Sequence, residues 1–507
     1  MDNIIYPLDE HNKKLLENVH PENYKNPVPK KIYDLVVIGA GTAGLVTAAA
    51  SCGLGAKVAL IEKALMGGDC LNFGCVPSKA IISSSRIAYE LQRASIYGIN
   101  NKFDRNDIDF KKIMERMRKK RSYISKHDSV KRFNKMGVDV FIGNAKFTGK
   151  NTIQVNEKTI LKFRKAAITT GATPAIPQIE GLEKSGYLTN ETIFSLTELP
   201  EKLAVIGGGP IGCELAQTFR RFGSDVVIIH NNRHLLNRED KEAALIVQNQ
   251  FLEEGIKVIL NTKIIKVQKN NKTKTIFYVE NNKEKALDVS DILIATGRIP
   301  NCKYLELENA GVKYDKNGII VNDKLETSNK RIYSAGDVSS KYKFTHAADY
   351  LARIVIQNAL FNRGAKASLL IIPWCTYTEP ELAHVGLSED EAIFKDIKYD
   401  KFFIDFKELD RAIVSGKEKG FVKILTKKGS DKIIGSTIIA ENAGDLISEV
   451  TIAMVHKIGL SGISSVIHPY PTIADAIRKS GDIYNRTKLT SFTAKLLKLL
   501  MWFGLRV

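Results

Sequence analysis

Residues 33–50 read YDLVVIGAGTAGLVTAAA, and this stretch decides the fold of the first part of the chain. An apolar run, a glycine-rich turn and a run of small residues predict a buried strand, a tight turn and a helix. The spacing of Gly39, Gly41 and Gly44 lets the backbone approach a pyrophosphate at the helix N-terminus. Residues 56–63, AKVALIEK, predict the next strand, so the chain opens with a βαβ unit.

A second unit of the same kind begins at residue 202. It reads KLAVIGGGPIGCELAQTFRRFG, followed by the strand SDVVIIH, and its turn contains Gly207, Gly209 and Gly212. Two such openings imply two nucleotides. Between and after them, runs such as NTIQV and TIFYVE predict antiparallel strands, and from about residue 371 the pattern predicts a separate α+β domain.

The second strands of the two units end differently. The first ends in Glu62, placed to bind a ribose 2′-hydroxyl, and the adjacent Lys63 is a further candidate cofactor contact. The second ends in His230, with Arg233 close behind and no acid. A carboxylate there would repel a 2′-phosphate, so its absence predicts NADPH, with NADH as the alternative.

Bulk composition limits the classes of function. The chain has 507 residues and a formal charge of +19, but its lysines are dispersed, which predicts a solvated surface and no nucleic-acid binding. No apolar run is long enough to span a membrane, and the N-terminus lacks a secretory signal pattern, so we expect a cytoplasmic protein. Six cysteines in such a chain are not expected to form a structural disulfide framework.

Cys70 and Cys75 stand out because they lie close together in a glycine-rich stretch. On a regular or distorted helix, four intervening residues bring two cysteines within disulfide reach. A zinc site would need a second Cys or His pair with ligand spacing, and none occurs, so no metal site is predicted. Two unpaired cysteines remain the alternative.

Five motifs follow one another along the chain: GAGTAG at 39–44, GGDCLNFGCVPSK at 67–79, GGGPIGCELA at 207–216, ATGRIPN at 295–301 and YSAGDV at 333–338. Together they resemble the pyridine nucleotide–disulfide oxidoreductase family, which includes glutathione reductase, dihydrolipoamide dehydrogenase and mercuric reductase. The resemblance implies a homodimeric α/β enzyme with two Rossmann-like domains, which bind FAD and NAD(P)H, and a C-terminal α+β dimerisation domain. The predicted boundaries are an N-terminal extension at 1–31, FAD domain at 32–185 and 306–370, NAD(P)H domain at 186–305, dimerisation domain at 371–484 and a basic amphipathic tail at 485–507.

The resemblance also implies a relay from NADPH through FAD to a Cys70–Cys75 disulfide. Cys75 would lie against the flavin, Cys70 would react with the acceptor, and Lys79 would pair with Glu214 beside the flavin. The other implied cofactor positions are Gly68, Ala145 near adenine, Gly171 in TTGA, Gly297 and Arg298 in ATGR, and Asp337 near the ribityl chain.

The stretch His468-Pro-Tyr470-Pro-Thr-Ile-Ala-Asp475 departs from the family pattern. Thiol-reducing members carry His-Pro-Thr with a Glu five residues after the His, and that pair acts across the dimer interface. Aligned on Pro-Thr, the two positions here hold Tyr470 and Asp475, and His468 lies two residues early. Tyrosine titrates near about 10 and is a poor base at neutral pH.

The departure leaves the electron acceptor open. Tyr470 favours a mercuric reductase-like enzyme that reduces a disulfide or a thiol-bound metal, although no cysteine follows Cys375 and no N-terminal GMTCxxC domain occurs. If His468 serves as the base, the chain is a dihydrolipoamide dehydrogenase or glutathione reductase-type enzyme. Further alternatives are a membrane-associated NAD(P)H:quinone or one-electron acceptor oxidoreductase and a non-catalytic flavoprotein sensor.

The last residues, TKLTSFTAKLLKLLMWFGLRV, combine apolar residues at helical spacing with Lys488, Lys495, Lys498 and Arg506. Such a helix either lies on the anionic inner face of a membrane or packs on the dimer or the FAD domain. Both alternatives stand at this point.

Overall fold

The computed structural model describes residues 5–505, which divide into two compact units. Unit 1 holds the residues up to Asn231 together with Glu254–Leu370, and unit 2 holds Asn232–Glu253 with the residues from Ile371 onward. Residues 232–253, assigned from sequence to the second nucleotide domain, thus group with the C-terminal part of the chain. The α/β class with two Rossmann-like sheets and a C-terminal α+β domain is confirmed, and the finer domain boundaries stay predictions.

The first sheet of unit 1 has seven strands, and its central strands are parallel. Nearly all residues of its strand β1 are buried, which explains why the sequence there is a continuous apolar run. The order across the sheet is β3 (Asp139–Ile142), β2 (Val58–Glu62), β1 (Tyr33–Ile38), β6 (Thr159–Ile168), β5 (Thr152–Val155) and β4 (Ala145–Gly149), with β18 (Ile332–Ser334) also on β6.

The second sheet of unit 1 is parallel and has four strands, and a three-stranded antiparallel sheet follows it. The parallel strands are β10 (Lys257–Ile259), β9 (Asp225–Ile229), β8 (Lys202–Ile206) and β14 (Asp291–Ile294). The antiparallel strands are β11 (Lys263–Asn270), β12 (Thr273–Glu280) and β13 (Lys283–Val289). Two short strands, β7 (Ala172–Pro174) and β15 (Arg298–Pro300), pair where the chain crosses between the two nucleotide-binding regions.

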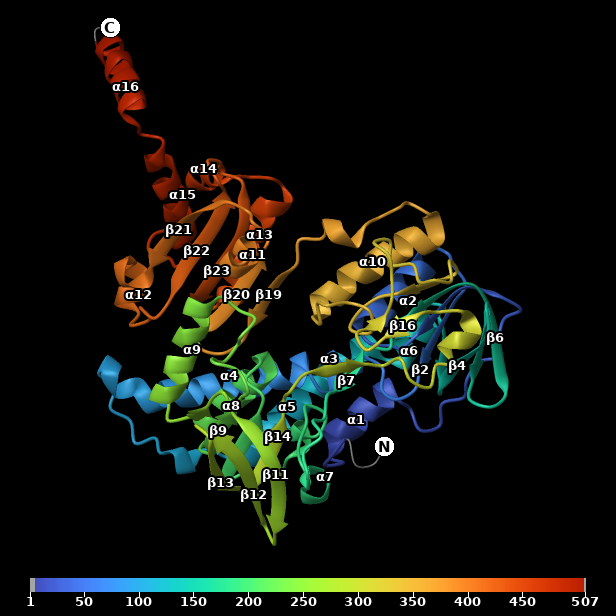
Figure 1. Ribbon diagram of the computed structural model, residues 1–507. Helices are drawn as coiled ribbons and strands as arrows, with labels where there is room; N and C mark the ends of the chain where they lie inside the picture. The colour runs from blue at the N-terminus through green and yellow to red at the C-terminus, as the bar shows by residue number, and fades with distance from the viewer. Residues whose placement is uncertain (1–4, 506–507) are drawn as a thin grey trace. The chain divides into compact units, whose positions relative to one another are not determined.

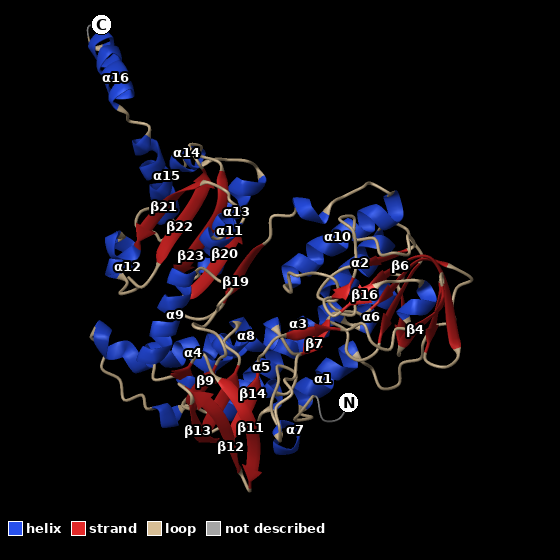
Figure 2. Ribbon diagram, in the orientation of Figure 1, coloured by secondary structure: helices blue, strands red, loops and turns tan. Residues whose placement is uncertain are grey.

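Helices cover both sheets of unit 1 (Figures 1 and 2). Helix α2 packs on α10, and α4 packs on both α5 and α8, while the N-terminal helix α1 packs on α5. Their bounds are α1 (Glu10–Val19), α2 (Thr42–Gly53), α3 (Gly68–Asn72), α4 (Cys75–Arg93), α5 (Phe110–Ser125), α6 (Val130–Lys135), α7 (Leu182–Ser185), α8 (Pro210–Phe222) and α10 (Thr345–Phe361).

Unit 2 is built on a five-stranded antiparallel sheet. Side chains of one face pack with helices α13 and α15, whereas helix α9 contacts the same sheet through β20 and β23. The strand order is β19 (Pro373–Thr376), β20 (Glu381–Gly386), β23 (Ile433–Ala440), β22 (Phe421–Lys427) and β21 (Tyr399–Asp405). The helices are α9 (Lys241–Glu253), α11 (Glu389–Phe394), α12 (Asp410–Val414), α13 (Ala443–Val455), α14 (Leu460–Ser464), α15 (Asp475–Thr487) and α16 (Ser491–Gly504).

Helix α16 forms as the apolar spacing predicts, but none of its residues is buried. It extends away from the sheet of unit 2 at the red end of the chain in Figure 1. Among residues 5–505, no helix is long and apolar enough to cross a membrane. Arg506, counted among the basic residues of the tail, lies outside the described residues.

Candidate active site

The first glycine turn joins strand β1 to helix α2 by direct backbone contacts. Gly39 has φ +99°, and a Cβ there would lie 2.5 Å from the carbonyl oxygen of Thr169. A Cβ on Gly44 would lie 1.8 Å from the carbonyl oxygen of Gly39. Gly41 is the N-cap of α2 and offers no side-chain cap, so the helix begins with free N–H groups suited to a phosphate.

Glu62 lies at the predicted place beside this turn. It is buried, and its two carboxylate oxygens accept hydrogen bonds from the backbone N–H groups of Ala40, at 2.7 Å, and Ala64, at 2.8 Å. Burial raises the pKa of the Glu62 carboxyl, against the lowering effect of these N–H groups. The carboxylate is therefore held rigidly with lone pairs left for a hydroxyl donor, while the neighbouring Lys63 is exposed.

The second turn repeats this geometry, except that the space beside its middle glycine is open. A Cβ on Gly207 would lie 2.3 Å from the carbonyl oxygen of Ala295, and a Cβ on Gly212 would lie 2.1 Å from that of Gly207. Nothing lies within 4 Å of a Cβ built on Gly209, the uncapped N-cap of α8. Both turns thus keep an open backbone face at a helix start, which fits the phosphates of FAD and of a pyridine nucleotide.

His230 occupies the position that Glu62 has in the first turn. Its Nδ1 accepts a hydrogen bond of 3.1 Å from the backbone N–H of Gly208, the residue after the first glycine of the motif. A ring nitrogen that accepts carries no proton, so the second turn ends in a neutral imidazole. Arg233, predicted to act beside it, belongs to unit 2, and its role stays a prediction.

The crossover motifs TTGA and ATGR meet in the two-stranded ladder of β7 and β15. Gly171 and Gly297 both have positive φ, with nothing within 4 Å of a built Cβ. The N–H of Asn301 donates to Gly171 O, and the N–H of Ala175 donates to Gly297 O, each at 2.9 Å. Two motifs far apart in sequence are therefore fixed together by main-chain hydrogen bonds.

The two cysteines lie on two successive helices, the short α3 and the long α4, rather than on one helix. Cys70 is in α3, and Cys75 is the first residue of α4, where its Sγ lies 3.2 Å from Thr345 Oγ1 at the start of α10. Both are free thiols, Cys70 half-buried and Cys75 exposed. Nothing in the cysteine motif itself predicts Thr345, which is 270 residues away in sequence.

The two thiols have opposite acidities because they interact. A hydrogen bond from the Cys70 thiol lowers the pKa of Cys75 to about 6, with Thr345 and the charge of Lys79 acting in the same direction. The same interaction, together with burial, raises the pKa of Cys70. Cys75 is thus the thiolate of the pair at neutral pH, and Cys70 is the proton donor to it.

Charged side chains from four motifs surround the cysteines. Lys79 Nζ lies 2.7 Å from Glu214 Oε2, which joins α4 to the helix of the second glycine turn. Arg298 Nη2 lies 3.3 Å from Asp69 Oδ1, and Arg298 Nε lies 3.6 Å from Asp337 Oδ2. The structure therefore brings the predicted residues Lys79, Glu214, Arg298 and Asp337 to the cysteine loop, and it adds Asp69.

Two observations bear on the fit of a flavin here. The buried Nε of Arg298 has no hydrogen-bond partner among residues 5–505, and burial raises the pKa of Asp337 against the attraction of Arg298. A Cβ on Gly68 would lie 2.6 Å from Cα of Gly41, so the phosphate turn and the cysteine loop touch without side chains between them. The residues present fit FAD. Ala145 is buried in β4 within an apolar cluster, and its contact with adenine stays a prediction.

Unit 2 contains the residues that depart from the family pattern, and each of them has a charged partner of its own. The hydroxyl of Tyr470 donates to Asp410 Oδ2 at 3.0 Å, which raises the pKa of Tyr470. His468 Nε2 lies 2.8 Å from Glu449 Oε1. Asp475, the aligned partner of Tyr470, forms its ion pair with Arg478 at 2.7 Å instead.

Tyr470 thus has Asp410 as its acidic partner, and His468 has Glu449. The phenol is 74% exposed, whereas the side chain of His468 is only 6% exposed. No local motif predicts Asp410 or Glu449, because each reaches its partner only through the tertiary fold.

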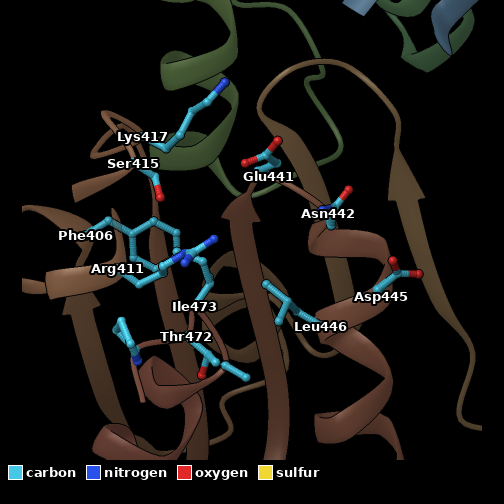
Figure 3. Close-up of a pocket in the computed structure, with 12 residues that line it drawn as sticks. Phe406, Arg411, Ser415, Lys417, Glu441, Asn442, Asp445, Leu446, Thr472 and Ile473 are labelled. Atoms are coloured by element: carbon cyan, nitrogen blue, oxygen red, sulfur yellow. The ribbon is translucent and has the colours of Figure 1, made fainter. Parts of the chain in front are cut away.

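A cavity of about 390 Å³ lies beside this segment within unit 2 (Figure 3). Pro471 and Thr472, which follow Tyr470 directly, form part of its wall, and Arg411, next to Asp410, lines it as well. Glu441 and Asp445 contribute carboxylates, so the wall carries both signs of charge. The sequence did not predict this cavity.

Comparison with known proteins places the chain in a family. Residues 33–351 match the family model "Pyridine nucleotide-disulphide oxidoreductase", and residues 372–480 match the dimerisation domain of the same family. The mercuric reductase of Lysinibacillus sphaericus is 32% identical over 464 residues, covering 91% of this chain and 83% of the relative. The dihydrolipoyl dehydrogenase of Buchnera aphidicola subsp. Baizongia pistaciae is 31% identical over 469 residues, covering 91% and 98%.

Solved structures agree on the fold. The Cu(II) complex of the HOCl-induced flavoprotein disulfide reductase RclA from Escherichia coli superposes with a TM-score of 0.80 at 24% identity, covering 90% of this chain and 100% of that one. The two family models together span most of the chain, including the glycine turns, the cysteine pair and the crossover. The chain therefore belongs to the pyridine nucleotide-disulphide oxidoreductase family and is an FAD- and pyridine nucleotide-dependent enzyme of that class.

Proposed function

We propose that the enzyme uses NADPH to reduce a thiol-bound metal ion or a disulfide through Cys70 and Cys75. The observation that carries this proposal is the placement of the two cysteines on the successive helices α3 and α4, with the Lys79–Glu214 ion pair one turn further along α4. When bound, FAD would supply the two-electron chemistry that connects the nicotinamide with the disulfide of Cys70 and Cys75. The chain then holds Cys75 as a thiolate and leaves Cys70 to react with the acceptor.

The charged residues around the cysteines support this division of roles. Lys79 is among the groups that lower the pKa of Cys75, and Glu214 holds its ammonium group at 2.7 Å. Asp69, next to Cys70, fixes Arg298. Lys79 and Arg298 act as positioning residues for the thiolate and for the bound cofactor.

The environment of Tyr470 favours the metal acceptor over a free thiol pair. A hydrogen bond to Asp410 raises the pKa of Tyr470, so the phenol remains protonated at neutral pH and cannot act as a base. The exposed hydroxyl can instead turn away from Asp410 and donate its one hydrogen bond to a thiolate ligand of a soft metal ion. Identity of 31–34% with relatives named mercuric reductase is consistent with this acceptor class.

The second candidate is a thiol–disulfide reductase of the dihydrolipoyl dehydrogenase or glutathione reductase type. The pair of His468 and Glu449, 2.8 Å apart, favours it because a carboxylate beside an imidazole is the usual arrangement of a thiol acid–base. The low exposure of His468 speaks for the first candidate.

NADPH is proposed as the coenzyme because His230 replaces the acid of the first turn. The neutral ring, fixed by Gly208, offers no negative charge to a 2′-phosphate. A homodimer is proposed because the C-terminal region matches the dimerisation domain of the family. In that dimer, Tyr470 would act on the site of the partner subunit.

We also propose that helix α16 holds the enzyme at an anionic membrane surface. The helix exposes Phe492, Leu496, Leu500 and Phe503 on one side, and no acidic residue follows Asp482. Its 14 residues extend about 21 Å, too short for the ~30 Å core of a bilayer. A basic helix of this length with Trp502 and two Phe residues lies in the headgroup plane.

The function is tested by comparing wild type with Cys70→Ser and Cys75→Ser in anaerobic assays with Hg(II) bound to excess thiol, lipoamide, oxidised glutathione and a quinone. We expect turnover of a metal or disulfide acceptor that both substitutions abolish. A quinone reductase activity spared by Cys70→Ser, without any turnover of the other acceptors, would overturn the proposal. Absence of flavin reduction by NADPH would point to a sensor.

A further inference from the structure

The N-terminal helix α1 packs directly beside the cysteine loop. Its residues Asn12, Leu15 and Val19 are completely buried, and the carbonyl oxygen of Val19 accepts a hydrogen bond of 3.1 Å from the N–H of Met66. Met66 stands immediately before the glycines of the cysteine motif. The helix lies before residue 33, where the match to the family model begins.

Arg121 of helix α5 connects α1 to the loop between the two cysteines. Its side chain is 1% exposed. One guanidinium nitrogen, Nη1, donates to the carbonyl oxygen of Asn72 at 2.7 Å, and the other, Nη2, donates to Asn12 Oδ1 at 2.8 Å. A single buried side chain therefore bridges the N-terminal helix and the backbone between Cys70 and Cys75.

Asn72 in turn holds the backbone of the cysteine loop through its side chain. Its side chain is completely buried, and Nδ2 donates to the carbonyl oxygens of Met66, at 3.1 Å, and Gly68, at 2.8 Å. Asn72 is the last residue of α3, two residues after Cys70 and three before Cys75. Its backbone position therefore sets how close the two sulfur atoms can remain.

The guanidinium of Arg121 is buried and forms no ion pair with any residue from 5 to 505. Both of its bonded acceptors are uncharged oxygens, and its Nε has no hydrogen-bond partner among the described residues. Burial lowers the pKa of Arg121 to about 10. An apolar side chain would fill the same space at lower desolvation cost. Arginine therefore serves this site through its two terminal nitrogens, which donate to two separate acceptors at once.

We propose that Arg121 and Asn12 are positioning residues for the redox pair, through which helix α1 sets the reduction potential of Cys70 and Cys75. The proposal rests on the proposed function of the cysteines. Oxidation of the two thiols forms one S–S bond and releases two electrons and two protons. An anchored loop keeps the sulfur atoms together in the dithiol state, which favours the disulfide. Without the anchor, the disulfide is easier to reduce.

The experiment uses full-length holoenzyme equilibrated in mixtures of reduced and oxidised dithiothreitol, with the Cys70–Cys75 peptide analysed by alkylation and mass spectrometry. Arg121→Met keeps the volume and removes both hydrogen bonds. Asn12→Leu leaves the bond from Arg121 to Asn72 in place, and it removes the link to α1 together with the hydrogen bond that Asn12 Nδ2 donates to the carbonyl oxygen of Pro7. We expect Arg121→Met to shift the equilibrium toward the dithiol by about threefold to tenfold, and Asn12→Leu to shift it in the same direction by less.

Arg118→Met is the matched control. Arg118 lies on the same helix, is buried, and also holds α1 through Asp9, with Nε and Oδ2 2.5 Å apart, but among the described residues it forms no hydrogen bond with the cysteine loop. We expect it to lower the melting temperature and leave the equilibrium unchanged. An equal shift in Arg118→Met, or no shift in a folded, flavin-containing Arg121→Met, would contradict the proposal. If Arg121→Met fails to fold, Asn12→Leu decides the question alone.

The equilibrium with dithiothreitol needs no NADPH and no acceptor. A shifted equilibrium in an enzyme that fails all acceptor assays would therefore sustain the positioning role while refuting the proposed function. The reverse pattern would refute the positioning role alone.

Discussion

The backbone N–H of Gly208 donates a hydrogen bond to Nδ1 of His230, 3.1 Å away. In the first turn, the N–H of Ala40 makes the equivalent bond to the carboxylate of Glu62, at 2.7 Å. The two turns therefore share one hydrogen-bond geometry, in which the acceptor is a carboxylate in the first turn and a neutral imidazole ring in the second. The difference concerns the place where a ribose 2′-substituent binds.

We expect the preference between NADPH and NADH to depend on this exchange of Glu62 for His230. His230→Glu restores a carboxylate acceptor for the N–H of Gly208, and the new charge repels a 2′-phosphate. We expect kcat/KM for NADPH to fall about tenfold or more and that for NADH to rise. His230→Gln, which can accept without a charge, is the control and should keep the NADPH preference. A wild-type enzyme that prefers NADH would refute the assignment.

The acidity of Cys75 depends on the donor that faces it. The hydrogen bond from Cys70 is the largest cause that lowers the pKa of Cys75 to about 6, so the thiolate is present above that pH and is lost below it. In the reduced enzyme, alkylation of Cys75 should rise with a midpoint near that value. Cys70→Ala should move the midpoint toward the ordinary ~8.5, whereas Cys70→Ser, with a hydroxyl donor, should move it less. Equal midpoints in all three proteins would show that Cys70 does not control the acidity.

The class of electron acceptor can be identified by replacing, one at a time, the two candidate acid–base residues of unit 2, Tyr470 and His468. Tyr470→Phe removes the hydroxyl that donates to Asp410, and it should lower kcat/KM for thiol-bound Hg(II) by about tenfold. His468→Ala should leave that activity nearly unchanged. Because hydrogen bonding raises the pKa of Tyr470, the contribution of its hydroxyl should not vary between pH 6 and 8, given an ordinary value near ~10. Efficient turnover of lipoamide that is lost in His468→Ala would establish the thiol reductase instead.

Membrane attachment predicts a dependence on both the apolar side and the lysines of α16. Full-length protein should sediment with vesicles that contain phosphatidylglycerol, and a chain ending at Thr490 should stay in solution. Leu496→Glu should abolish binding, while Lys495→Gln with Lys498→Gln should weaken it and reduce its salt dependence. Binding to neutral vesicles should be weak. Equal sedimentation of the full and shortened chains, or self-association through α16 without vesicles, would contradict the proposal.

The sequence predicts the glycine turns well because everything they need is local. Gly39 and Gly207 must have positive φ beside a neighbouring strand, and both requirements are present in a short motif. Glu62 and His230 follow at a fixed distance because strand and helix lengths in a βαβ unit vary little. The fold class could be inferred from these two units and from the change of pattern near residue 371.

The pairings around Tyr470 could not be inferred in this way. Asp410 lies 60 residues before Tyr470 and belongs to a short helix, and only the packing of unit 2 brings the two together. Alignment suggested Asp475 as the partner, but Arg478, one turn later on the same helix, competes for that carboxylate. Within one subunit, this carboxylate is therefore engaged by a neighbour on its own helix, and its role beside Tyr470 stays a prediction.

The N-terminal segment was predicted only as a polar extension. Helix α1 has few apolar residues, and they become a core element only because α5 and Met66 accept them. Isolated helices of this length are marginal in water, so the tertiary contacts decide its structure. Sequence patterns report such a helix poorly.

Gly68 and Gly41 meet backbone to backbone, since a methyl group on Gly68 would lie 2.6 Å from Cα of Gly41. No rotatable side chain lies between the phosphate turn and the cysteine loop, so neither can shift without moving the other. We therefore expect a single added methyl group in Gly68→Ala to disturb the phosphate turn and the cysteine loop together, so that weaker cofactor binding and altered thiol reactivity would appear in the same variant.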